Sequence, residues 1–433
     1  METGFSTRRL EAILEEWEVC RVKTRVKKFE AAEGKLLSME LNEEEGISCR
    51  GIKDGKVCFA YTFEKGEKAA EGLAANIAAL APFLDADPYG ALPARYERYP
   101  DLDLYDEAGL NTADDAKIDA LLDMESVIRT HDRRIVQTRD CALHESELHV
   151  QIVNSRGLEA HAKKTVYTLG AMAVARDADD EVSWYDWSWA TRYGDLDGPK
   201  LGRQIGEKTV SCLSGEVLAT GVYTGLLTPA CACRMLEVLS YSFLSENVYK
   251  NKTSLKGKVG ARCFSERLSI VDSGVRGMEA FPFDGEGVPS RENVLAKNGV
   301  LQTFLYDTYY GRRLEKESTG NSVRHGVKAP PACGSRGFFI EAGGDDPVAE
   351  NGEVVVEDLM GVHMANAITG DFSLGATGQY YSGETRRPFK GVILSGNLFV
   401  LLNQVRAVGK DLTFYGPYGS PTLLVEGLKI SGA

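Results

Sequence analysis

The stretch ELHVQIVNSRGLEAHAKKTVYTLGAMAVARDADDEVSWYDWSWATRY, residues 147–193, decides the fold class. Apolar and polar residues alternate along three runs, and the segments NSRG (154–157) and DADD (177–180) separate these runs. Alternation with a period of two is typical of a strand with one buried face, and Asn, Asp and Gly are favoured in turns. These residues therefore predict a three-stranded antiparallel meander.

The rest of the N-terminal half alternates between strand-like and helix-like patterns. Alternation predicts strands at 19–31, 36–41 and 57–63. Apolar residues at helical spacing predict helices at 10–17, 68–80, 112–128 and 199–213. The third of these helices is expected to start at Thr112, with Asp115 as the acid of a capping box. Residues 85–105 have no periodicity and are expected to form a connector.

A second half of the chain begins near Gly215. Residues 218–227 predict a strand, and Thr228 followed by Pro229 is a typical helix start. Beyond Ser254 the pattern is one of short strands and glycine turns. We therefore expect an α+β fold with antiparallel sheets, in which an N-terminal region (1–214, with subdomains at about 1–84 and 106–214) precedes a mostly β C-terminal domain (215–433).

Composition excludes several classes of function. The net charge is −13, and the basic residues between Arg21 and Lys28 are interleaved with apolar ones, so direct nucleic-acid binding is not expected. The nine cysteines are scattered without a CxxC pair. The opening residues do not resemble a signal peptide, and the apolar stretch 391–405 is too short and too interrupted to span a bilayer. We expect a cytoplasmic protein with no membrane contact.

The sequence contains a literal HExxxH motif at His144–His149. Zinc peptidases carry such a motif on a helix, which points both imidazoles at one ion. Here the motif runs into the strand-like segment 148–153, and residues five apart on a strand point to opposite faces. The two imidazoles are therefore not expected to share a metal ion.

Two other chemistries have weaker support. His325, Cys333 and His363 could form a zinc site, but their spacing matches no known local ligand pair. Cys231 and Cys233 lie in the first turn of the helix after Pro229, where a thiolate is stabilised, although no nearby histidine could serve as a base. Packing in the core is the preferred interpretation of both thiols. The segment 370–375 (GDFSLG) indicates either sheet corners or a ligand-facing surface.

Taken together, several segments resemble the TldD/PmbA family, which includes chains labelled modulators of DNA gyrase. They span nearly the whole chain in the family's order, and they are GISCR (46–50), GK (55–56), AYT (60–62), NSRG (154–157), STGNSVR (318–324), TGDFS (369–373), SGNL (395–398), SPTLLV (420–425) and ISG (430–432). The resemblance implies an intracellular family of zinc metallopeptidases. The negative charge makes any link to DNA an indirect one.

The catalytic TldD type carries HExxxH on the helix that here follows Pro229, together with a cysteine near the C-terminus. In this chain that helix begins ACACRMLE (230–237), and no cysteine follows Cys333. The resemblance therefore implies a PmbA/TldE-type subunit, with no catalytic residue, metal ligand or cofactor assigned to it.

Three functions remain open from the sequence. The first is a non-catalytic subunit that pairs with an HExxxH-bearing relative and binds extended peptides by strand addition. Candidate peptide-binding residues are those of the two glycine segments: Ser318, Thr319, Gly320, Asn321, Gly370, Asp371 and Phe372. The second is a stand-alone metallo- or thiol-dependent peptidase with an unconventional site. The third is a homodimeric peptide-binding or scaffold protein.

Overall fold

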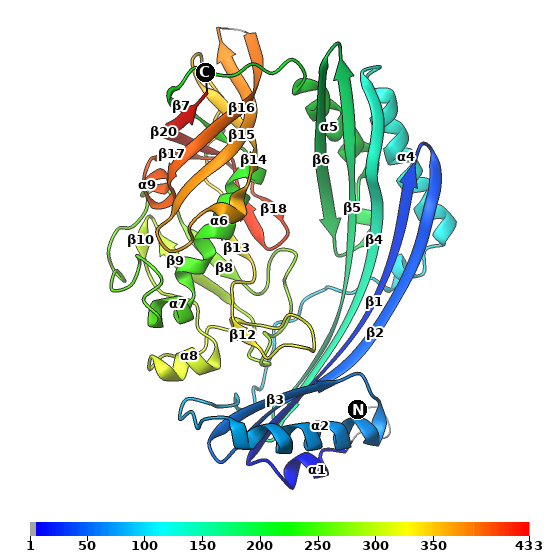
Figure 1. The fold of residues 1–433 in the computed structure, drawn as a ribbon, viewed down its shortest axis with the longest axis vertical. Coiled ribbons are helices and arrows are strands. Elements are labelled where there is room, and N and C mark those ends of the chain that lie inside the picture. Colours follow the sequence, from blue (N-terminus) through cyan, green and yellow to red (C-terminus); the bar gives the residue numbers. More distant parts are fainter. Residues whose placement is uncertain (1–5, 384, 433) are drawn as a thin grey trace.

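The computed structural model describes residues 6–383 and 385–432, and it has an α+β fold built on three six-stranded sheets (Figure 1). The first sheet belongs to the N-terminal half, and the other two form most of the C-terminal half. The predicted fold class is therefore confirmed. In the part of the chain that is described, no helix is both long and apolar enough to cross a membrane.

The first sheet is antiparallel throughout and has the order β3-β2-β1-β4-β5-β6. Its strands are β1 (Glu16–Ala32), β2 (Lys35–Lys53), β3 (Lys56–Thr62), β4 (Ile135–Asn154), β5 (Glu159–Asp177) and β6 (Asp180–Ala190). The predicted meander is the β4-β5-β6 part. At the turn between β4 and β5, Oδ1 of Asn154 accepts hydrogen bonds from the backbone N–H groups of Arg156 and Leu158. Gly157 supplies the positive φ of 80° that closes this turn.

Two pairs of helices cover one face of this sheet at opposite ends (Figure 1). At one end, α4 (Asp114–His131) and α5 (Gly198–Ser211) bury an apolar core against β1, β4 and β5. At the other end, α1 (Arg8–Glu11) and α2 (Gly66–Leu80) pack on β2 and β3. The opposite face of the sheet is turned toward the C-terminal half, which covers it.

Two expectations about helices are wrong in detail. The opening helix stops at Glu11, because β1 begins at Glu16 and Trp17 pairs with Gly51 of β2. Strand pairing over the length of β1 therefore outweighs the helical spacing of a few apolar residues. Thr112 does not cap α4, which begins two residues later, since the Thr112 hydroxyl donates to the carbonyl oxygen of Ala108.

The C-terminal half contains two more sheets and a two-stranded one. One six-stranded sheet has the order β10-β9-β8-β13-β19-β18, and the other has the order β16-β15-β14-β7-β20-β17, in which pairing of β16 with β20 closes a ring. Most pairs are antiparallel, but β13–β19 and β14–β7 are parallel. The strands are β7 (Gly221–Leu227), β8 (Ile270–Ser273), β9 (Glu292–Lys297), β10 (Val300–Leu301), β11 (Ser322–Val323), β12 (Ala332–Cys333), β13 (Phe338–Ile340), β14 (Val354–Met360), β15 (Asp371–Ser382), β16 (Thr385–Asn397), β17 (Val405–Val408), β18 (Thr413–Tyr415), β19 (Tyr418–Ser420) and β20 (Leu423–Ser431).

Helix α6 (Pro229–Ser240) is the central helix of this half. It begins as predicted, because Thr228 accepts a hydrogen bond from the Cys231 N–H and Pro229 occupies the first turn. Its apolar residues join the largest core of the molecule. The remaining helices are short and are α3 (Glu107–Leu110), α7 (Ser245–Tyr249), α8 (Thr308–Arg313) and α9 (Leu398–Asn403).

Candidate functional site

A cavity of about 640 Å³ lies between the first sheet and the C-terminal half. Even-numbered residues of β4, namely Leu148, Val150 and Ile152, form its apolar wall together with Val22 of β1. Residues on a strand alternate between faces, so the odd-numbered residues of β4 point to the side that carries the α4 and α5 helices. The opposite wall comes from segments 279–285, 322–326 and 332–336 and from Tyr241 and Tyr418.

The hairpin formed by β11 and β12 is the part of this wall that reaches the N-terminal half. Its loop buries Val327 against β2, where a Cβ at Gly46 would lie 2.6 Å from a Val327 methyl carbon. Lys328 lies over the ring of Phe63, 5.3 Å from its centroid. The cavity is thus bounded by a hairpin whose loop rests on the other domain.

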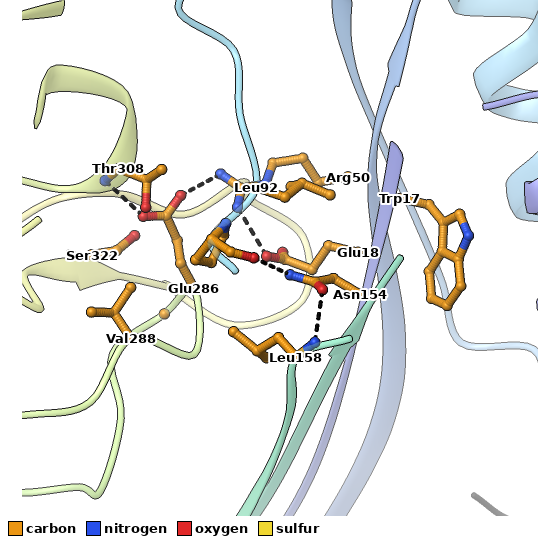
Figure 2. Close-up of polar contacts among 12 residues, drawn as sticks. Trp17, Glu18, Arg50, Leu92, Asn154, Leu158, Glu286, Val288, Thr308 and Ser322 are labelled. Carbon is orange, nitrogen blue, oxygen red and sulfur yellow. Dashed lines mark hydrogen bonds and ion pairs between the residues drawn. The ribbon is translucent and has the colours of Figure 1, made fainter. Parts of the chain in front are cut away.

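A buried ionic network joins the same two halves (Figure 2). The Arg50 guanidinium on β2 binds Glu286 at 2.6 Å and Glu18 of β1 at 2.9 Å. Arg324, which follows β11, also pairs with Glu18, and the backbone N–H of Thr308 donates to Glu286. Buried charges of this kind are tolerated only when they are paired and hydrogen-bonded. The network therefore fixes how the two halves meet.

Three further buried carboxyl groups lie around this network. Burial, followed by repulsion from Glu286, raises the pKa of Asp284 and of Asp307 to about 7. Burial also raises the pKa of Asp272 to about 6, although hydrogen bonds from the Arg336 backbone and from Asn321 oppose this. Burial acts to raise the pKa of Glu286 too, but the Arg50 charge together with hydrogen bonds from the Thr308 backbone and from Arg50 holds that pKa below its ordinary value.

The predicted segment 318–321 lies behind the cavity wall. Asn321 is 1% exposed, and its amide donates to Asp272 at 2.6 Å and to the Gly334 carbonyl at 3.2 Å. Its Oδ1 accepts from the Thr319 hydroxyl and from Asn293. The side chains of Thr319 and Asn321 are thus engaged in holding the β11–β12 hairpin, and Ser322, the next residue, is the first to line the cavity.

The second predicted segment lies elsewhere. Gly370 and Asp371 stand at the start of β15, and Phe372 is buried in the C-terminal core, 8% exposed. Asp371 accepts hydrogen bonds from Thr369 and Asn397 on the surface. The structure therefore does not bring 370–372 together with 318–321 at one surface, and the peptide-binding role of both segments stays a prediction.

The literal HExxxH motif lies within β4, as predicted. The His149 imidazole contacts Glu147 at 2.8 Å beside Tyr105, whereas His144 lies near Thr168 of β5 and lines a smaller cavity of about 220 Å³ with Tyr185 and Trp187. Residue parity along β4 places the two imidazoles on opposite faces. They cannot bind one ion.

The thiol alternative is not supported by the structure. Cys231 and Cys233 are both buried, and burial raises the pKa of both thiols, that of Cys233 to about 12. The Cys233 sulfur lies 3.4 Å from the Tyr418 carbonyl oxygen. A helix N-terminus lowers a thiol pKa only when the sulfur is accessible enough to ionise, so desolvation is the larger effect here.

The alternative zinc site of His325, Cys333 and His363 is also not formed. His325 is exposed at the cavity, and Cys333 is buried with its sulfur 3.3 Å from the Ser245 hydroxyl. His363 lies on an exposed turn of 3₁₀ helix. Within 6–383 and 385–432, no group of three or more His, Cys, Asp or Glu side chains is arranged to hold a metal ion.

The end of α6 meets the turn between β18 and β19, near the C-terminus. Ser240, the last residue of α6, has its hydroxyl 3.5 Å from the phenol oxygen of Tyr418, and Ser240, Tyr241 and Tyr418 line the cavity. A zinc ion of the peptidase type needs imidazole, carboxylate or thiolate ligands. Neutral hydroxyl groups do not fit that requirement, so the residues at this place do not match the zinc site that the family implies.

The residues of the ionic network were missed by sequence reasoning. Arg50 and Arg324 belong to segments that carry the family resemblance, but the sequence assigns them no role. No sequence pattern assigns a role to Glu18 or Glu286 either. A buried charge has no periodic signature of its own, and its partners lie 32 to 306 positions away. The one available signal is that Glu18 stands between the apolar residues Trp17 and Val19.

Comparison with known proteins agrees with this architecture. Residues 109–213 match the PmbA/TldA metallopeptidase central domain, and residues 220–432 match the PmbA/TldA metallopeptidase C-terminal domain. The chain belongs to the TldD/PmbA family.

Among individual relatives, the chain is 27% identical to the metalloprotease PmbA of Escherichia coli O157:H7, over 77% of this chain and 73% of that protein. The crystal structure of TldE from Thermococcus kodakarensis superposes with a TM-score of 0.88 at 22% identity and covers 98% of both chains. A Thermotoga maritima protein, described as a candidate modulator of a DNA gyrase, superposes with a TM-score of 0.85 at 25% identity over 96% of both chains.

Proposed function

We propose that this chain is the non-catalytic subunit of a TldD/PmbA-type zinc peptidase, and that its cavity binds a segment of extended peptide for a partner chain that carries HExxxH. The observation that carries the proposal is the meeting of α6 with the C-terminal turn. At this place, which faces the cavity, Ser240 and Tyr418 present neutral hydroxyl groups, which are not zinc ligands of the peptidase type.

The chemistry of the cavity suits a peptide main chain. Its volume lies within the range of binding sites for small ligands, and one wall is an apolar sheet face. The cationic side chains around it are already engaged: Lys164 donates to the carbonyls of Met278 and Ala280, and Arg324 pairs with Glu18. The cavity therefore offers an apolar surface and the short β11–β12 hairpin. This combination discriminates little between the side chains of a bound peptide.

Complex formation is the first test. The chain is co-expressed with an HExxxH-bearing relative from the same genome and purified through a tag on this chain. We expect a stable heteromer whose peptidase activity is lost on chelation and restored by zinc, and whose activity also needs this chain. A tagged chain that never retains the relative, or that hydrolyses peptides alone with stoichiometric zinc, contradicts the proposal.

Peptide binding is the second test and uses two variants of one strand. Leu148→Lys places a charge on the half-buried cavity wall, whereas Val136→Lys changes an exposed position of β4 outside the cavity. With an uncharged fluorescent peptide, we expect the affinity of Leu148→Lys to fall about tenfold or more, because a charge must be desolvated there. The Val136→Lys variant should bind like the unmodified chain. Equal binding by both variants would place the peptide elsewhere.

A further inference from the structure

The smaller cavity, of about 220 Å³, lies on the same face of the first sheet as the main cavity. Among the described residues, its lining comes from β1, β4, β5 and β6 and shares no residue with the main cavity. Ala142 and His144 have the same parity along β4 as Leu148, so their side chains leave the sheet on the same side. The volume is below the range typical of small-molecule sites and suits one side chain of a larger ligand.

The strand register explains why this cavity exists. In one cross-strand row, Glu30 of β1 lies opposite Ala142 of β4. Ala142 lies opposite Gly170 of β5, which in turn lies opposite Trp187 of β6. The two smallest residues of the row are neighbours in its middle and form the floor of the cavity, while Glu30 and Trp187 form its ends. A Cβ at residue 170 would lie 2.8 Å from the Tyr185 phenol oxygen and would fill this floor.

The charges of the smaller cavity favour a cationic ligand. Lys28 is paired with Glu30 at 2.5 Å, so these two charges offset each other. The carboxylate of Asp140 has no hydrogen-bond or ion-pair partner among the residues that the structure describes. Burial, followed by the Lys28 charge, lowers the pKa of His144, so its imidazole is neutral at neutral pH. An anion would therefore meet an unpaired carboxylate in this cavity, whereas a cation would pair with it.

A β-bulge sets the position of Asp140. The ladder between β4 and β5 shifts between Arg139 and Ala142, and Asp140 has a φ of 48° there. Aspartate is one of the few residue types that adopt this left-handed conformation readily. Bulges redirect side chains and are common beside binding sites.

Two aromatic rings and two neutral polar groups complete the wall. Tyr185 is 49% exposed, and Trp187 is partly buried. The faces of such rings attract ammonium and guanidinium groups. The Thr168 hydroxyl lies 3.4 Å from a ring nitrogen of His144, and both side chains can accept a hydrogen bond from a cationic donor. An unpaired carboxylate, ring faces and hydrogen-bond acceptors together fit a lysine or arginine side chain.

The sheet surface connects the two cavities. Val26, Ser146 and Val166 form the cross-strand row between them, and each is only partly buried. His144 and Leu148 are four positions apart along β4, so about 13 Å of strand separates the two cavities. An extended peptide that runs along β4 covers this distance with about four residues.

We propose that the smaller cavity binds a lysine or arginine side chain of a peptide that also occupies the main cavity, about four residues away. This inference rests on the proposed function and deepens it, because it names the class of peptide as one with a basic residue. The main cavity discriminates little between side chains, so the smaller cavity supplies the selection.

The site is tested first without a peptide. The probe is Nα-acetyl-lysine methylamide, its neutral counterpart is Nα-acetyl-norleucine methylamide, and binding is measured by NMR titration. We expect the unmodified chain to bind the lysine probe about tenfold more tightly, because only this probe pairs with the carboxylate and the ring faces. Asp140→Asn should remove the preference. Asp54→Asn should keep it and is the matched control, since Asp54 has a similar φ of 51° and does not line the cavity. No preference in the unmodified chain, or a preference that survives Asp140→Asn, overturns the proposal.

A lysine scan of an otherwise uncharged fluorescent peptide tests the geometry. One lysine should raise the affinity about tenfold at a single position of the peptide and little elsewhere, and Asp140→Asn should abolish this gain. Leu148→Lys should weaken the binding of every peptide in the scan, because all of them occupy the main cavity. Peptides that bind equally well wherever the lysine stands overturn this inference and leave the proposed function intact. A chain that selects the lysine probe but binds no peptide counts against the proposed function alone.

Discussion

Arg50 and Glu286 form a buried ion pair of 2.6 Å between the first sheet and the C-terminal half (Figure 2). The second guanidinium nitrogen of Arg50 binds Glu18, which also pairs with Arg324, so two cations balance two buried carboxylates. Removing one partner of this pair would destabilise the protein by more than the intact pair stabilises it, because an uncompensated charge would stay buried.

Arg50→Met is therefore expected to destabilise the protein by about 3 to 5 kcal/mol. The methionine keeps most of the side-chain volume but leaves Glu18 and Glu286 short of a partner. Urea unfolding followed by tryptophan fluorescence measures the change. Arg9→Met is the control, because Arg9 pairs with Glu67 and Glu71 on the surface and its loss should change stability little. Equal effects of the two variants would show that the buried network contributes nothing special.

The raised pKa of Asp307 predicts a dependence of stability on pH. Burial and Glu286 raise this pKa to about 7, whereas the carboxyl group of an unfolded chain titrates near 4. Between these values the folded state holds a proton that the unfolded state has lost. Stability from this group is therefore fully present below about pH 4 and is lost as the pH rises through about 7.

Asp307→Asn isolates the effect. Asp307 caps α8 by accepting a hydrogen bond from the Tyr310 N–H, and asparagine caps equally well without the charge. Between pH 5 and pH 8, the stability of the variant relative to the unmodified chain should rise by on the order of 3 kcal/mol. Thermal unfolding at both pH values measures this difference. A constant offset between the two chains across this range would contradict the assignment.

The sequence predicts much of this fold because the N-terminal strands have one buried and one more exposed face, which gives an alternating pattern of apolar and polar residues. The meander around Asn154 and the helix start at Thr228 both follow from local rules that the structure obeys. Trp17 shows the limit of such rules. Trp17 and the apolar residues before it have helical spacing. Its conformation is nevertheless decided by pairing with Gly51, which lies thirty-four residues further along the chain.

The candidate site could be predicted less well from the sequence, because its contacts also join residues that are distant along the chain. Asn321 and Thr319 were picked out as peptide-binding residues, and the structure engages their side chains in supporting the wall of the cavity. The sequence alone does not show whether a polar side chain next to glycine faces a ligand or a buried carboxylate. Which of the two it meets depends on Asp272 and Asn293, which no local pattern connects to it.

Alkylation of the cysteines should follow burial. Cys231, Cys233 and Cys333 are buried and have raised thiol pKa values, so iodoacetamide should modify them only on unfolding. Cys212 and Cys263 are partly exposed and should react first. Mass spectrometry of tryptic peptides over a time course measures the order. Fast modification of Cys231 or Cys233 with loss of peptidase activity would revive a thiol mechanism.

Asn321→Ala should weaken peptide binding by disturbing the wall rather than by removing a contact. The change leaves Asp272, Asn293 and the Gly334 carbonyl without their buried partner, which is expected to cost about 2 to 3 kcal/mol of stability. Because Asn321 also ties β11 to β12 through its backbone, peptide affinity should fall in parallel.

Asn321→Asp separates support from recognition. A carboxylate at 321 keeps the shape but would face Asp272 across a contact that is now 2.6 Å, so one of the two acids must hold a proton. Peptide affinity of this variant, measured by fluorescence anisotropy, should therefore approach that of the unmodified chain at pH 5 and fall as the pH rises. If Asn321 bound the peptide itself, the loss would persist at low pH, where the wall is intact but the amide donor is missing.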